Sequence, residues 1–261
     1  MSNSPLQLAK RGFKSVSKRL GGGGLRNPLP GPPDLKSLYP EANSEDEALL
    51  KTIAPFTFTP LTRQFGLLKA IRYINNNGIP GDIVECGVWR GGNVMLAKAA
   101  SKGSSLARRY YLFDTFAGMS APGDVDIAYT GEHASVEFDK GLRHDHNEWC
   151  YASREEVECN FADAGLLGED VIFCQGNVED TLKDHSNIPE QIALLRLDTD
   201  WYSSTKIELE MLYPRLVQGG VIIIDDYGHW EGARRAVDEY FGSRAPLLIA
   251  VDLTCRFAIK I

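Results

Sequence analysis

The chain has no uninterrupted apolar run that approaches the roughly 20 residues needed to span a membrane. Its first residues lack the apolar core of a signal peptide, and its five cysteines are scattered, odd in number and without a CxxC pair. Neither a disulfide framework nor a zinc site is therefore indicated. These absences predict a cytoplasmic protein with no integral membrane span.

Acidic residues outnumber basic ones in most of the chain, and the start of the chain shows the opposite balance. Residues 1–36 carry seven basic side chains and one acidic one, a net charge of +6, which leaves −13 for the rest of a chain whose net charge is −7. An acidic body argues against nucleic acid as a partner. Glycines at 21–24 and the prolines after them separate an N-terminal basic arm, residues 1–40, from a domain over residues 41–261. The arm fits a flexible tail, a lid over the active site, a partner-binding arm or a membrane-surface helix.

Two apolar runs, at 192–195 and 221–224, are each followed by a pair of carboxylates: Asp198 and Asp200, and Asp225 and Asp226. A helical pattern lies between the runs, and a right-handed crossover makes the two strands parallel. If the strands are neighbours, all four carboxylates meet at the carboxyl edge of the sheet, where ligands bind in such folds. Their mutual repulsion predicts a positive partner, for which a hard divalent cation is the simplest candidate. Helix capping by these aspartates is the alternative.

A glycine-rich turn follows an earlier strand, in the stretch 81–93. The turn is neither GxGxxG nor followed by GK[ST], so it gives little support to a dinucleotide or P-loop site. Glu85 at the end of the strand would repel a pyrophosphate, whereas S-adenosylmethionine carries an ammonium and a sulfonium and has no phosphate. The next strand, 109–113, ends in Asp114, which is well placed for ribose hydroxyls, with a helix cap as the alternative.

The remaining patterns complete an α/β fold. They predict helices at 45–76 with a break at 55–60, and at 94–100, 153–164, 203–219 and 232–241, and strands at 171–175, 246–251 and 255–261. The last two strands are joined by few residues and should form an antiparallel hairpin. We expect a doubly wound, mostly parallel, seven-stranded sheet with this C-terminal hairpin, a Rossmann-like class I methyltransferase fold. The polar stretch 117–149 should be a long irregular insertion, in which a solvated loop is favoured over a metal site at His144 and His146.

Several ungapped motifs resemble the macrocin O-methyltransferase family of sugar O-methyltransferases. In chain order they read ECGVWRGG (85–92), FDTFAGM (113–119), QGN (175–177), LRLDTDWYSST (195–205) and IIIDDYGHWEGARRAVDEYF (222–241). The similarity extends over about residues 55–261. It implies an enzyme that uses S-adenosylmethionine and Mg²⁺ to methylate a hydroxyl of a sugar or glycosylated natural product.

The resemblance also implies a role for individual residues. The expected contacts of S-adenosylmethionine are Glu85, Cys86, Gly87, Asp114, Thr115, Phe116, Ser153, Gly176, Asn177 and Asp198. Mg²⁺ is expected to bind Asp198, Asp225 and Asp226, with Asp200 as the general base and with His229 and Trp230 near the substrate. A catechol-type methyltransferase and a non-catalytic nucleotide-binding scaffold are the alternatives, and the four aspartates argue against the scaffold. The sequence leaves open the acceptor and the oligomeric state, a homo-oligomer included.

Overall fold

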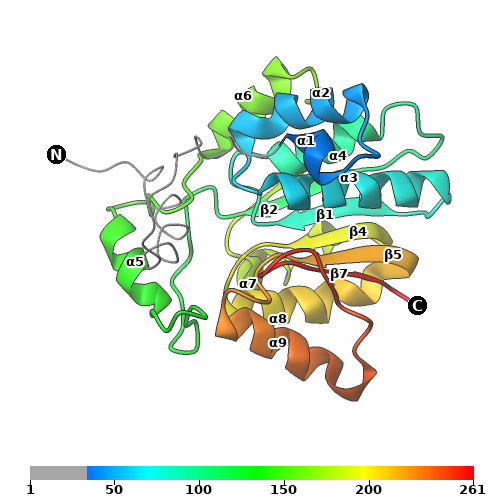
Figure 1. The fold of residues 1–261 in the computed structure, drawn as a ribbon. Coiled ribbons are helices and arrows are strands. Elements are labelled where there is room, and N and C mark those ends of the chain that lie inside the picture. The colour runs from blue at the N-terminus through cyan, green and yellow to red at the C-terminus, as the bar shows by residue number, and fades with distance from the viewer. Residues whose placement is uncertain (1–33) are drawn as a thin grey trace, which may run out of the picture.

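The computed structural model describes residues 34–261 (Figure 1). Most of the basic arm predicted over residues 1–40 lies outside the described residues, so its four alternatives stay predictions. The end of the arm is described: α1 (Leu35–Leu38) begins at the N-cap Asp34, and Leu35 is buried in the core. The ring of Tyr39 lies 4.4 Å from that of Phe65, centroid to centroid. Residues 34–40 therefore pack against the domain.

Within residues 34–261 the centre is a seven-stranded sheet in the order β3-β2-β1-β4-β5-β7-β6. Its strands are β1 (Asp82–Cys86), β2 (Tyr110–Asp114), β3 (Val171–Gln175), β4 (Ile192–Leu197), β5 (Leu216–Ile224), β6 (Ile249–Ala250) and β7 (Arg256–Ile259). The first five pair in parallel, whereas β7 pairs antiparallel with both β5 and β6. The predicted doubly wound sheet with a C-terminal hairpin is confirmed.

Helices cover both faces of the sheet (Figure 1). One face carries α1, α2 (Ser44–Ile53), α3 (Leu61–Asn76), α4 (Gly92–Ala100) and α6 (Arg154–Asp163). The other carries α7 (Val178–Thr181), α8 (Tyr202–Met211) and α9 (Glu231–Phe241). Alternate strand residues supply the two cores: Ile223 packs in the first and Ile222 in the second. None of these described helices combines the length and the apolar character needed to cross a membrane.

Short 3-10 turns connect several elements: η2 (Ala54–Phe56), η3 (His185–Asn187), η4 (Tyr213–Arg215) and η5 (Gly242–Arg244). Two of them mark chain breaks caused by proline. The predicted interruption at 55–60 is confirmed, because η2 contains Pro55 and α3 begins directly after Pro60. The predicted start of α6 is also confirmed, because the Ser153 side chain accepts a hydrogen bond from the Glu156 backbone N–H at 3.2 Å.

Three predictions about secondary structure are wrong, two in the length of an element and one in a missed helix. The helix expected over 203–219 ends at Met211, because Pro214 lies in η4 and β5 already begins at Leu216. The strand expected over 246–251 pairs only at Ile249–Ala250. The insertion 117–149, expected to be irregular, contains α5 (Ala134–Gly141), which stands to one side of the sheet (Figure 1).

Candidate active site

A cavity of about 340 Å³ opens at the carboxyl edge of the sheet, where β1, β2, β4 and β5 end. Strand-end residues form its floor, and aromatic side chains from three loops, among them Phe58, Trp89 and Trp149, lie around it. A smaller cavity of about 50 Å³ adjoins it and reaches Gly176 and Asn177. Six of the predicted cofactor residues line one or both cavities: Gly87, Asp114, Thr115, Gly176, Asn177 and Asp198.

The glycine-rich turn after β1 passes directly against the end of β4. Gly87 has a φ of 82°, and a Cβ built on it would lie 2.0 Å from the carbonyl oxygen of Asp198. A side chain therefore has no room at this position, and the left-handed backbone also favours glycine. Gly87 lines both cavities.

Asp114 fixes the same turn from β2. Its carboxylate accepts backbone N–H bonds from Val88 at 2.8 Å, Trp89 at 3.1 Å and Phe116 at 2.8 Å. Burial raises the pKa of Asp114, and these hydrogen bonds, which favour the charged form, oppose the rise. Because Asp114 lines both cavities, it stands at their junction.

Four of the predicted cofactor residues line neither cavity. Glu85 is buried in an ion pair with Arg196, and Cys86 is buried in the core on the opposite side of the sheet. Phe116 is buried with its ring 5.9 Å from that of Phe173, and Ser153 caps α6. Their contact with the cofactor stays a prediction.

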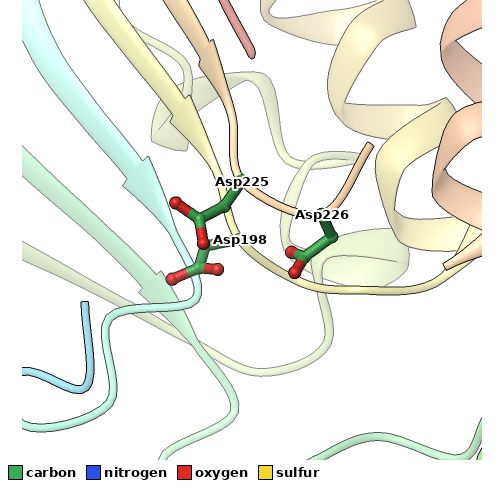
Figure 2. A group of neighbouring side chains, drawn as sticks. All are labelled: Asp198, Asp225 and Asp226. Atoms are coloured by element: carbon green, nitrogen blue, oxygen red, sulfur yellow. The ribbon is translucent and has the colours of Figure 1, made fainter. Parts of the chain in front are cut away.

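Three of the four acidic residues at the strand ends converge as expected (Figure 2). Asp198, Asp225 and Asp226 each offer a carboxylate oxygen, and these oxygens lie within 4.8 Å of one another. The reason is register: Leu197 pairs with Ile224, so both strands end level, and the Asp225 N–H donates to the Leu197 carbonyl at 3.0 Å. Within residues 34–261 this is the one group of carboxylates, histidines or cysteines with such spacing, so His144 and His146 are not part of one.

Two arginines that the sequence interpretation missed supply positive charge to this cluster. Arg196 on β4 is 3% exposed and contacts Glu85, Asp198 Oδ2 at 2.6 Å and Asp225 Oδ1 at 2.7 Å. On the other side, Arg63 on α3 pairs with Asp225 and with Asp252, the latter at 2.6 Å. The signal for Arg196 was visible in the sequence, since it is a charged residue inside an apolar strand and lies two positions before Asp198.

The cluster nevertheless presents an oxygen atom that is available to a divalent cation. The Oδ2 atom of Asp226 is buried and has no hydrogen-bond partner among the described residues. Burial raises the pKa of Asp226 well above its ordinary value, and the neighbouring charges of Asp200 and Asp225 raise it further. An unpartnered carboxylate oxygen beside two further carboxylates is a donor set that a hard cation such as Mg²⁺ prefers. The residues present therefore fit the predicted ion, although their role as ligands stays a prediction.

Asp200 lies in the same cavity but makes a different set of contacts. Its Oδ1 accepts the indole N–H of Trp230 at 2.7 Å, and its backbone is left-handed with a φ of 70°. Burial, with the charge of Asp198, raises the pKa of Asp200 to about 7, against the effect of the Trp230 hydrogen bond. A carboxyl group that titrates near neutral pH is well suited to accept a proton. His229 also lines the cavity, and burial lowers its pKa.

Comparison with known proteins shows the family to which the chain belongs. Residues 45–258 match the family model described as macrocin-O-methyltransferase (TylF). The chain belongs to the macrocin O-methyltransferase family. It is therefore an O-methyltransferase of a family that depends on S-adenosylmethionine, which confirms the predicted resemblance and enzyme class.

Individual members show the same relationship. The chain is 38% identical over 188 residues to the 8-demethyl-8-(2,3-dimethoxy-α-L-rhamnosyl)-tetracenomycin-C 4'-O-methyltransferase of Streptomyces olivaceus, covering 71% of this chain and 67% of that one. It is 34% identical over 198 residues to the demethyldecarbamoylnovobiocin O-methyltransferase of Streptomyces niveus, covering 76% and 71%. The solved structure of the O-methyltransferase NovP has a TM-score of 0.67 and 32% identity, covering 78% of this chain and 82% of that one.

Proposed function

We propose that this O-methyltransferase uses S-adenosylmethionine and Mg²⁺ to methylate a hydroxyl group on the sugar of a glycosylated natural product. The observation that carries the proposal is the placement of Asp200 beside Asp198, Asp225 and Asp226 in one cavity that also contains Asp114. The printed names of two relatives support the acceptor class, since they describe a rhamnosyl tetracenomycin and a novobiocin precursor.

The two adjoining cavities would bind different parts of the cofactor and the acceptor. Asp114 would hold ribose hydroxyls at their junction, and Gly176 and Asn177 would flank the adenine in the smaller cavity. The larger cavity would hold the sugar, and its aromatic side chains offer flat apolar surfaces for the rest of the acceptor.

Asp198, Asp225 and Asp226 would hold the cation. When bound, S-adenosylmethionine supplies an electrophilic methyl group and Mg²⁺ supplies Lewis-acid charge, which favours loss of a proton from a hydroxyl. Asp200 accepts that proton, and the indole N–H of Trp230 keeps its Oδ1 in place. The chain thus contributes positioning and proton removal, which are the demands of methyl transfer to a weakly acidic alcohol.

The test is a transfer assay on the full chain with S-adenosylmethionine tritiated in its methyl group. The acceptors are 8-demethyl-8-(2,3-dimethoxy-α-L-rhamnosyl)-tetracenomycin C, demethyldecarbamoylnovobiocin and, for the aromatic-diol alternative, catechol. We expect label on a glycoside, loss of transfer in EDTA and recovery with Mg²⁺. Transfer to catechol alone would contradict the acceptor class, and full transfer in EDTA would contradict the metal.

A further inference from the structure

Thr199 lies between Asp198 and Asp200 in the chain, but its side chain contacts the layer of helices on the other face of the sheet. Its hydroxyl donates a hydrogen bond to Glu208 Oε1 at 2.8 Å. Glu208 belongs to α8, which packs on the face of the sheet away from α3 (Figure 1). Side chains alternate at the end of a strand, so when Thr199 points towards α8, Asp198 points towards Arg196. One turn therefore joins the acidic cluster to a carboxyl group on the other face.

The surroundings of Glu208 are unusual for an acidic residue. Its side chain is 0% exposed, and within the described part of the chain it forms no ion pair. The Oε2 atom is buried without a hydrogen-bond partner among those residues, and the thiol of Cys86 lies beside the carboxyl group. Burial raises the pKa of Glu208 well above its ordinary value, which favours the neutral form of the group. Burying such a group is costly, and its contact with Thr199 is the one that reaches the cavity turn.

The turn that Thr199 belongs to has to be held in place. Asp200 adopts a left-handed backbone, which is uncommon for a residue with a side chain and persists only where surrounding contacts enforce it. After the turn, the fully buried Trp201 donates its indole N–H to the Ser120 carbonyl at 2.9 Å. Before it, the Asp198 N–H donates to the Cys86 carbonyl at 2.9 Å. Thr199 lies between these two contacts, and the hydrogen bond to Glu208 anchors its side chain.

We propose that Glu208 is a positioning residue, which anchors Thr199 and thereby sets the placement of Asp198 and Asp200 in the cavity. This inference rests on the proposed roles of those two aspartates. Loss of the anchor frees the Thr199 side chain and lets the turn relax from its left-handed conformation. Asp198 then moves relative to Asp225, and Asp200 moves relative to Trp230.

The indole N–H of Trp230 provides a direct readout, because it is hydrogen-bonded to Asp200. We compare the full chain with Glu208→Leu, Glu208→Gln and Thr199→Val by ¹⁵N NMR, with the Trp89 indole signal as the control. Glutamine keeps an acceptor for Thr199, whereas leucine and valine each remove one side of the bond. We expect Glu208→Leu and Thr199→Val to shift the Trp230 signal and Glu208→Gln to leave it near the parent position.

Mn²⁺ binding, followed by electron paramagnetic resonance, is the second readout. Both disruptive variants should weaken it by about 10- to 100-fold, the usual cost of losing support behind a metal ligand, and Glu208→Gln should retain it. If Glu208→Leu does not fold, Thr199→Val decides the result, since it removes only a donor. Folded variants with unchanged Trp230 signals would overturn the role of Glu208. A parent protein that binds no Mn²⁺ would instead contradict the metal site, while the indole signal would still test the anchor.

Discussion

Trp230 donates its indole N–H to Asp200, with 2.7 Å between Nε1 and Oδ1. The two residues come from different parts of the sheet edge, since Asp200 follows β4 and Trp230 is the N-cap of α9. The Trp230 ring also packs edge-on against that of Trp201, with centroids 5.0 Å apart. This contact fixes one carboxylate oxygen of Asp200, the residue that we propose as the general base.

Replacing Asp200 should separate proton removal from binding. We expect Asp200→Asn to slow the chemical step by about 10²- to 10⁴-fold, the typical loss for a general base, with S-adenosylhomocysteine and Mn²⁺ still bound. Trp230→Phe keeps an aromatic ring but removes the donor, so it should slow the step by a smaller factor, on the order of tenfold. Single-turnover rates and calorimetric titration measure the two effects. An Asp200→Asn enzyme with the parent rate would remove Asp200 from the mechanism.

The two arginines of the acidic cluster should differ in their effect on stability. Arg196→Met leaves Glu85 buried without its ionic partner, and such a loss typically costs about 3–5 kcal/mol of unfolding free energy. Arg63→Met is the matched control. Arg196 still pairs with Asp225, and Asp252 keeps backbone N–H bonds from Thr254 and Cys255. We therefore expect a smaller loss from Arg63→Met in urea unfolding. Equal losses of unfolding free energy in the two variants would show that Arg196 does not stabilise the buried carboxylates more than Arg63 does.

The glycine turn allows a comparison between two left-handed glycines. A Cβ at Gly87 would lie 2.0 Å from the Asp198 carbonyl oxygen, whereas one at Gly165 would meet nothing within 4 Å. Gly165→Ala should therefore lower the unfolding free energy by only about 1–2 kcal/mol, the cost of a left-handed backbone for a residue with a Cβ atom. It should leave cofactor binding intact. Gly87→Ala should cost more and also weaken S-adenosylhomocysteine binding, as measured by calorimetry. Equal stability and affinity in the two variants would contradict the close approach of β1 and β4 at the cavity.

The parts of the fold that follow from local patterns were predictable. Apolar runs ending in acidic residues marked β4 and β5, and the convergence of Asp198 with Asp225 followed from parallel register. The position of Arg63 depends on a contact 162 residues away along the chain, which no local pattern contains. The end of α8 does not follow from a local pattern, because Gly219 and Gly220 are typical of a helix end but lie inside β5. Glu208 reads as an ordinary helix residue in the sequence, and only packing shows that it is buried.

The buried carboxyl of Glu208 should make stability depend on pH. Burial raises its pKa in the folded state, so its favourable contribution is complete below the unfolded pKa of about 4.3 and declines as the pH rises above it. Glutamine does not titrate. The melting temperature of Glu208→Gln minus that of the parent should therefore increase between about pH 5 and pH 8. Thermal unfolding followed by circular dichroism measures this difference, and a value independent of pH would show that Glu208 is not held protonated.

The most direct test of the proposed metal site is the binding of Mn²⁺ to the full chain, measured by electron paramagnetic resonance with S-adenosylhomocysteine present. We predict one ion per chain, displaced by Mg²⁺, because Asp198, Asp225 and Asp226 offer three converging oxygens and Asp226 Oδ2 has no partner within residues 34–261. Asp226→Asn should weaken this binding strongly, and Asp200→Asn should retain it. No binding to the parent, or equal binding to the parent and to Asp226→Asn, would contradict the three-aspartate site.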